Sequence, residues 1–165
     1  MTQSVTVPVR KTVTVPTSQA RAFAIFTTEF DSWWYPSHHI GAEPYESVTI
    51  EPRVGGRWFE RDANRNECDW GRVLEWEPPT RIVLAWQLTH EFKYDADFQT
   101  EVEIRFIAVD ANTTRVELEH RGLDAFGEHA DQMREGLGSG GGWGLLITRY
   151  EEYASGKSEL TVLPE

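Results

Sequence analysis

The clearest structural pattern in the chain lies in the segment Gly71-Arg72-Val73-Leu74-Glu75-Trp76-Glu77-Pro78-Pro79-Thr80-Arg81-Ile82-Val83-Leu84-Ala85-Trp86. Its second half continues to Leu88 and places large apolar side chains at every other position, which is typical of a strand with one buried face. Its first half, residues 70–76, has the residue types of a strand as well. The Glu77-Pro78-Pro79-Thr80 sequence favours a turn. The segment therefore predicts two adjacent antiparallel strands.

Similar patterns on both sides extend this pair into a larger sheet. Turn signals occur at Gly55-Gly56, at residues 64–66 and at residues 110–113, and they separate short runs of strand-forming residues. The first strand shows valine at most odd positions and threonine at most even ones. About seven strands are predicted in all: residues 5–15, 45–51, 57–62, 70–76, 82–88, 100–109 and 114–121.

Helices are predicted after the first strand and near the end of the chain. Thr17 or Ser18 can cap a helix that runs through Phe26, and a short second piece ends at Pro36. Apolar residues from Trp143 to Ala154 recur at helical spacing. The order predicts one α+β domain over residues 1–165, in which a curved antiparallel sheet wraps a long C-terminal helix. We expect the core at residues 5–154 and a loosely held tail at 155–165.

Charge and composition limit the function. The chain has 165 residues and a net charge of −11, and no run of Lys or Arg offers a basic patch. This argues against nucleic-acid and anionic membrane partners. Seven Trp, five Tyr and eight Phe suggest either a ring-lined cavity or rings presented to a partner. With one cysteine, Cys68, and no apolar leader in the first residues, we expect a cytoplasmic protein.

The order of elements resembles the START-like helix-grip superfamily, also called SRPBCC. The residues that carry the resemblance are Gly55-Gly56-Arg57-Trp58, the segment from Gly71 to Trp86, and Gly142-Trp143. Within the superfamily the chain is most similar to the C-terminal domain of the activator of the heat-shock protein 90 ATPase. The resemblance runs from about Val5 to about Ala154. It implies the helix-grip fold and a cavity between sheet and helix.

Superfamily members hold apolar ligands such as lipids, polyketides or aromatic hormones, and some are cyclases or hydrolases. A few bind chaperones, but the chain shows no separate chaperone-binding domain of the kind the true activators carry. We therefore expect a binding protein for a small apolar or aromatic ligand, without visible catalytic machinery or cofactor. A cyclase or hydrolase is the alternative, and a chaperone-interacting module is the third and least favoured. The first strand and the tail could also pair two copies into a homodimer.

The alternation of the strands predicts which residues face this cavity, although a plain aromatic core would give the same pattern. The predicted ligand-binding residues are Trp33, Trp34, Phe59, Trp86, Phe106, His120, Trp143, Ile147 and Tyr150. Three arginines are in phase with them and could anchor a polar ligand group: Arg57, Arg61 and Arg72. Each could equally pair with an acidic side chain, or point outward if a bulge shifts the phase.

Catalytic signals are weak. His120 ends the last strand beside the predicted cavity, so it is the candidate general acid or base, although a hydrogen-bonded structural histidine fits as well. The five histidines show no metal-ligand spacing, so no metal site is expected. The glycine-rich run at residues 136–142 follows no strand and does not predict a nucleotide site. It could instead let the backbone approach Trp143 closely or permit a lid to open.

Overall fold

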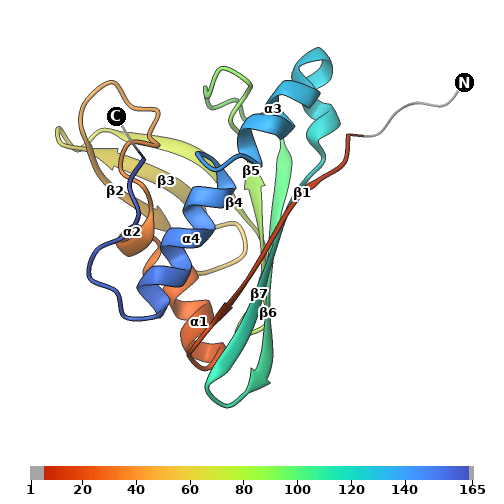
Figure 1. Cartoon of the computed structure of the whole chain (residues 1–165). Helices are drawn as coiled ribbons and strands as arrows, with labels where there is room; N and C mark the ends of the chain where they lie inside the picture. The colour runs from red at the N-terminus through yellow and green to blue at the C-terminus, as the bar shows by residue number, and fades with distance from the viewer. Residues whose placement is uncertain (1–5, 164–165) are drawn as a thin grey trace, which may run out of the picture.

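The computed structural model describes residues 6–163 and contains a seven-stranded sheet in the order β1-β7-β6-β5-β4-β3-β2 (Figure 1). All neighbouring strands are antiparallel. The strands are β1 (Val9–Val15), β2 (Tyr45–Ile50), β3 (Arg57–Asp62), β4 (Glu67–Glu77), β5 (Arg81–Trp86), β6 (Thr100–Asp110) and β7 (Thr113–Arg121). The predicted curved antiparallel sheet is confirmed; Val5, where the first strand was predicted to start, lies outside the described residues.

Four α-helices and one 3₁₀ segment cover one face of the sheet (Figure 1): α1 (Gln19–Phe26), α2 (Phe30–Trp33), η1 (Leu123–His129), α3 (Ala130–Leu137) and α4 (Trp143–Ala154). Ser18 caps α1, since its side chain accepts a hydrogen bond from the backbone N–H of Arg21. The helix α4 has the bounds predicted from the spacing, Trp143–Ala154, but at 12 residues and about 18 Å it is of ordinary length for a helix.

The sequence did not predict α3. Its surroundings between Asp124 and Glu135 are acidic, which suggested a solvated surface. The structure shows a narrow apolar stripe, however: Ala130, Met133 and Leu137 are buried at helical spacing. Three apolar positions among many charged ones are too few to predict a helix from the sequence. In the structure these three side chains are sufficient to pack the helix beside β1 and the glycine-rich run.

Gly71 sets the approach of β4 to β5. A Cβ atom built on Gly71 would overlap the carbonyl oxygen of Ala85 on β5, so no other residue fits there without moving a strand. Register shifts follow on both sides, between Trp58 and Phe59 in the β3–β4 pair and between Val73 and Glu75 in the β4–β5 pair. Each shift changes which residues face the helices.

The outer face of the sheet carries ion pairs. Glu103 on β6 is buried among the guanidinium groups of Arg81, Arg105 and Arg121. Hydrogen bonds from these arginines outweigh the effect of burial and lower the pKa of Glu103 to about 2. The outer face is thus charged and solvated, whereas the inner face is apolar.

The segment that follows α4 forms hydrogen bonds with this helix. Arg149 on α4 donates from its guanidinium to the carbonyl oxygens of Trp33 and Thr161, at 2.9 and 2.7 Å. The backbone N–H of Thr161 donates to Glu152 at 2.8 Å. The last two residues, 164–165, lie outside the described part. Within residues 6–163, none of the helices has the length and hydropathy that a membrane crossing requires.

Candidate ligand-binding cleft

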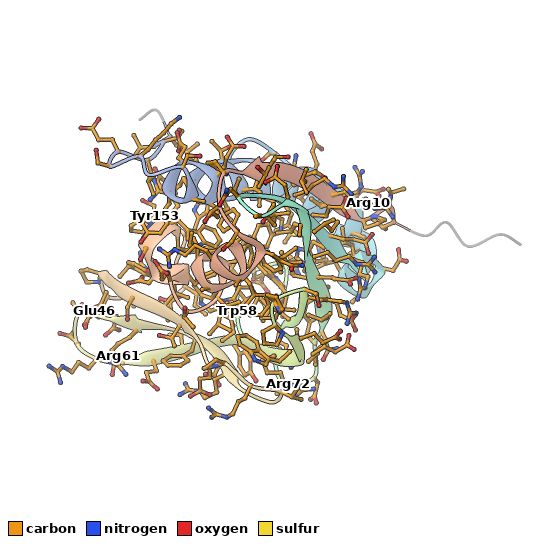
Figure 2. All side chains as sticks on the ribbon, turned by 90° about the horizontal axis from the view of Figure 1, so that it is seen from below. Arg10, Glu46, Trp58, Arg61, Arg72 and Tyr153 are labelled. Atoms are coloured by element: carbon orange, nitrogen blue, oxygen red, sulfur yellow. The ribbon has the colours of Figure 1, made fainter. Side chains whose placement is uncertain are left out.

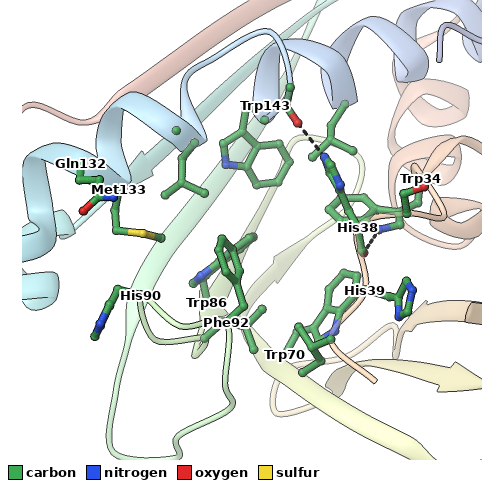
Figure 3. A pocket seen from close by; sticks show the side chains of 18 residues that line it. Trp34, His38, His39, Trp70, Trp86, His90, Phe92, Gln132, Met133 and Trp143 are labelled. Carbon is green, nitrogen blue, oxygen red and sulfur yellow. Dashed lines mark hydrogen bonds between the residues drawn. The ribbon is translucent and has the colours of Figure 1, made fainter. Parts of the chain in front are cut away.

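A cleft of about 590 Å³ opens at one end of the space between sheet and helices (Figure 3). Its walls come from the end of α2 and the loop after it, from β4, from β5 and the loop that follows, from α3, and from the start of α4. The lining residues are Trp34, Ser37, His38, His39, Ile40, Trp70, Trp86, Leu88, His90, Phe92, Gln132, Met133, Gly136, Leu137, Gly141, Gly142, Trp143 and Leu146. The lining is therefore mainly apolar and unusually rich in indole rings.

Four tryptophans form the inner wall. Trp34 packs on Trp70 with ring centroids 5.1 Å apart, and Trp86 lies 6.1 Å from Trp143. Trp34 and Trp143 complete the contact at 6.3 Å. Large rings that pack on each other at these spacings hold one another in place. The four rings therefore form one packed apolar wall.

The loop after α2 is tied across the mouth of the cleft. The indole N–H of Trp34 donates to the carbonyl oxygen of His38 at 2.9 Å. The His38 ring in turn donates from Nε2 to the carbonyl oxygen of Gly141, at 2.7 Å. The glycines are needed here, since a Cβ on Gly142 would lie 2.5 Å from the carbonyl oxygen of Gly136. The glycine-rich run therefore folds back on itself, with Gly142 packed against the backbone of Gly136 and Leu137.

Glu60 on β3 supports the same loop from below. Its carboxylate is fully buried and accepts hydrogen bonds from the backbone N–H groups of Ile40 and Gly41, at 2.6 and 3.1 Å. It also accepts from the indole N–H of Trp70 at 2.8 Å. Three donors compensate for the burial of a carboxylate. Glu60 thus fixes one cleft ring and the loop that carries His39 and Ile40.

His120 lies behind the wall and is fully buried. Its Nδ1 accepts from the indole N–H of Trp143 at 3.1 Å, so Nε2 carries the proton and donates to Thr100 Oγ1 at 2.7 Å. Burial lowers the pKa of His120 to about 3, so the ring is neutral at neutral pH. Both nitrogens are occupied, which leaves no lone pair for the general-base role considered from the sequence. His120 instead positions Trp143.

The structure brings only part of the predicted ring set to the cleft. Trp34, Trp86 and Trp143 line it, and His120 supports it. Four other predicted residues pack in the core outside the lining: Trp33, Phe106, Ile147 and Tyr150. The sequence analysis missed His38, His90 and Phe92, because they lie in loops where no periodicity shows which way a side chain faces.

The orientation predicted for Phe59 and the arginines is corrected. On β3 the residues Trp58 and Glu60 are fully buried on the inner face, so Phe59 between them lies on the outer face, under the guanidinium of Arg57 at 4.1 Å. Arg57 pairs with Asp69, and Arg61 pairs with Glu67 at 2.8 Å. Figure 2 shows Arg61 and Arg72 pointing away from the sheet and Trp58 pointing into the core. Alternation along β3 is unbroken, so Arg57, Phe59 and Arg61 share the outer face, and the prediction chose the wrong one of the two faces. The extra residue at the register shift is Trp70, which belongs to β4.

Comparison with known protein families identifies the chain. Residues 16–153 match the model of the AHSA1 family, described as Activator of Hsp90 ATPase homolog 1-like protein. The chain belongs to this family. The resemblance inferred from the sequence is thus confirmed, together with the helix-grip fold. No curated protein matches the chain.

Solved structures of other helix-grip proteins resemble this AHSA1-family chain over most of its length. An anthrahydroquino-gamma-pyrone synthase, Txn09, complexed with SUM, is 34% identical, with a TM-score of 0.62, covering 90% of this chain and 97% of its own. The self-sacrificing resistance protein CalC from Micromonospora echinospora is 26% identical, with a TM-score of 0.66, covering 93% and 98%. CalU16 from the same organism is 17% identical with a TM-score of 0.57 over 92% and 76%, and shows the shared fold alone.

Proposed function

We propose that this AHSA1-family protein binds a small planar aromatic ligand in the tryptophan-lined cleft. The observation that carries the proposal is that four packed indoles, each only 2–5% exposed, contribute to the lining of a single cleft. At about 590 Å³, the cleft has the size of sites that enclose drug-sized molecules. A flat ligand would continue the ring stack and remove apolar surface from water.

The similarity to Txn09 supports an aromatic ligand. That protein is a synthase of an anthrahydroquino-gamma-pyrone, and it matches this chain over nearly its whole length. The same similarity favours a second candidate function, a cyclase that acts on an aromatic substrate in this cleft. The cleft of the present chain supplies imidazole groups from His38, His39 and His90 for such chemistry.

Calorimetric titration with anthraquinone tests the binding function. Gly136→Phe adds a ring at the lining of the cleft, because Gly136 lines it and a Cβ built there meets no atom within 4 Å. Gly140→Phe is the matched control, since Gly140 has equally open surroundings and is not part of the lining. We expect Gly136→Phe to weaken binding by about tenfold or more, and Gly140→Phe to leave it unchanged.

Equal affinities of the two variants would place anthraquinone elsewhere on the protein, and no heat of binding to the unsubstituted protein would reject the proposal. Cyclase activity is tested separately, by incubating the protein with aromatic polyketide precursors and following product mass. A product that forms at the same rate with Gly136→Phe would argue against catalysis in the cleft.

A further inference from the structure

Two residues that line the cleft, His39 and Trp86, each have a buried nitrogen without a hydrogen bond. Among residues 6–163, three buried side-chain nitrogens lack a hydrogen bond: His39 Nδ1, Trp58 Nε1 and Trp86 Nε1. His39 Nδ1 lies 3.8 Å from a carboxylate oxygen of Glu60, so a partner is close at hand. Trp58 lies in the core, outside the lining. Only the indole N–H of Trp86 combines a place in the cleft wall with no neighbouring acceptor.

An indole nitrogen donates a hydrogen bond and cannot accept one. A native protein rarely leaves such a group buried and unpaired, and the exceptions often mark functional positions. The other cleft tryptophans with buried N–H groups have partners: Trp34 donates to His38, Trp70 to Glu60 and Trp143 to His120. The unpaired N–H of Trp86 thus suits an oxygen acceptor brought by a ligand.

His38 offers the complementary group. Since its Nε2 donates to the carbonyl oxygen of Gly141, the neutral ring carries its proton on Nε2 and keeps a lone pair on Nδ1. Within the described chain, no side chain or backbone group donates to this Nδ1. Figure 3 shows the imidazole of His38 beside Trp143, with Trp86 and Trp70 also bordering the cleft. Two residues that line the cleft, Trp86 and His38, therefore carry one unpaired donor and one unpaired acceptor within the described chain.

The loop between β5 and β6 provides access to Trp86. Phe92 on this loop lines the cleft, is 47% exposed and has a φ of +58°. A side chain in the left-handed region is strained, and an exposed loop moves at little cost. A ligand can therefore displace Phe92 more readily than it can displace the packed indoles.

We infer that the cleft selects planar aromatic molecules that carry both a carbonyl group and a free hydroxyl group. The N–H of Trp86 donates to the carbonyl oxygen, and the hydroxyl donates to Nδ1 of His38. This inference rests on the proposed binding function and narrows the class of ligand. Hydroxylated quinones and pyrones carry both groups, whereas unsubstituted polycycles and their ethers do not.

Three compounds substituted at the same ring position test the inference by calorimetry at about pH 8, where imidazoles are as a rule neutral. Hydroxyanthraquinone carries both groups, methoxyanthraquinone lacks the hydroxyl, and hydroxyanthracene lacks the carbonyl. We expect hydroxyanthraquinone to bind about tenfold more tightly than either of the other two, because each lacks one hydrogen bond.

Two His38 variants separate the acceptor from the contact with Gly141. The amide nitrogen of Gln reaches the position of Nε2, so His38→Gln can still donate to Gly141 but has no acceptor at the Nδ1 position. The carbonyl oxygen of Asn occupies the Nδ1 position, so His38→Asn keeps an acceptor and loses the contact with Gly141. We expect His38→Gln to abolish the preference for hydroxyl over methoxy, and His38→Asn to retain most of it.

Trp86→Phe removes the free N–H, and Trp58→Phe removes a similarly buried N–H outside the cleft. We expect Trp86→Phe to weaken binding of hydroxyanthraquinone by about tenfold and of hydroxyanthracene much less, and Trp58→Phe to affect the two equally. If all three compounds bind the unsubstituted protein with equal affinity, or if the preferences survive in His38→Gln and Trp86→Phe, the inference is wrong while aromatic binding stands. If none of the three binds, the proposed function fails as well.

Discussion

The two ends of the space between sheet and helices are both filled with aromatic rings, yet only one of them borders the cleft that we propose as the binding site. At the closed end, Phe23, Phe26, Phe106, Trp33 and Tyr150 pack with centroid distances of 5.0–5.9 Å. At the open end the cleft indoles pack at 5.1–6.3 Å. Ring type and spacing are the same, so neither distinguishes a core from a binding wall.

Coverage and hydrogen bonding make the difference. At the closed end, α1 and α4 cover the sheet, and the polar atoms of the rings are satisfied: Trp33 donates to the carbonyl oxygen of Ile25 and Tyr150 to that of Ala22. At the open end, α3, the start of α4 and the adjoining loops surround the cleft, and the N–H of Trp86 stays unpaired. An unsatisfied buried N–H costs about 1–3 kcal/mol, which a ligand bound in the proposed site would recover. The proposed site therefore differs from the closed end in having a cleft beside a buried N–H without a hydrogen bond.

Gly71→Ala should have the largest effect, because it disrupts the pairing of the two strands that carry cleft residues at the open end. The added methyl group would overlap the carbonyl oxygen of Ala85, so β4 and β5 must separate where they carry Trp70 and Trp86. We expect a loss of about 4 kcal/mol or more in the free energy of unfolding, measured by urea titration.

Gly140→Ala is the control for this prediction, since its new Cβ meets no atom within 4 Å. We expect its stability to match that of the unsubstituted protein within about 1 kcal/mol. Similar stabilities for the two variants would mean that the strands do not approach as closely at Gly71 as the structure shows.

Phe26→Ala and Phe92→Ala contrast the two ends directly. Phe26 is fully buried at the closed end, and its truncation should cost about 3–5 kcal/mol without changing affinity for anthraquinone below the unfolding temperature. Phe92 is 47% exposed at the open end, so its truncation should cost about 1 kcal/mol or less and change the affinity. Thermal unfolding and calorimetry measure the two effects. If Phe26→Ala changed the affinity for anthraquinone and Phe92→Ala did not, the ligand would bind at the closed end.

His120 makes the support of the open end sensitive to acid. The folded protein lowers the pKa of His120 to about 3, whereas the unfolded chain takes up the proton below about pH 6.5. The unfolded state therefore binds more protons in this range, and stability falls as the pH falls from about 6.5 towards 3. The slope approaches about 1.4 kcal/mol per pH unit.

His120→Asn tests this, because Asn can still accept from Trp143 but does not titrate. Between about pH 6.5 and 5, where Glu103 with its lowered pKa of about 2 stays ionised, the unsubstituted protein should lose about 1–2 kcal/mol more than the variant. Urea titrations at the two pH values measure the difference. Equal losses would show that His120 is protonated in the folded state or exposed to water.

The sheet could be predicted from the sequence because alternation and turn residues act locally. The hairpin at residues 110–113 and the cap at Ser18 are examples. The face of β3 could not be predicted, since large aromatic side chains occur in both alternating sets, Trp58 in one and Phe59 in the other. Tertiary contacts decide between the sets: Trp58 packs on Phe30 in the core, so Phe59 and Arg57 lie on the outer face.

The cleft was predictable only where its residues belong to regular elements. Trp86 on β5 and Trp143 at the start of α4 follow from periodicity. His38 and Phe92 lie in loops, where no periodic pattern predicts the direction of a side chain. The first loop is held by the hydrogen bond of His38 to the distant Gly141, and the second by the backbone hydrogen bond from Phe92 to Thr89. The role of His120 could not be predicted, because it depends on two hydrogen-bond partners, Thr100 and Trp143, that are distant in sequence. Trp143 is separated from His120 by 23 residues.

Arg72→Met should have the smallest effect, and it tests whether the ligand binds only on the inner face of the sheet. Arg72 is exposed on the outer face and stands opposite Arg57 in the β3–β4 register. Like charges directly opposite each other on neighbouring strands are destabilising, so removing the charge of Arg72 relieves this repulsion. Because the side chain is also exposed, we expect the free energy of unfolding to change by no more than about 0.5 kcal/mol. Calorimetry should give the same affinity for anthraquinone as the unsubstituted protein. A clear loss of affinity would mean that the ligand contacts the charged outer face of the sheet. The difference between the open and closed ends of the inner face would then not explain where the ligand binds.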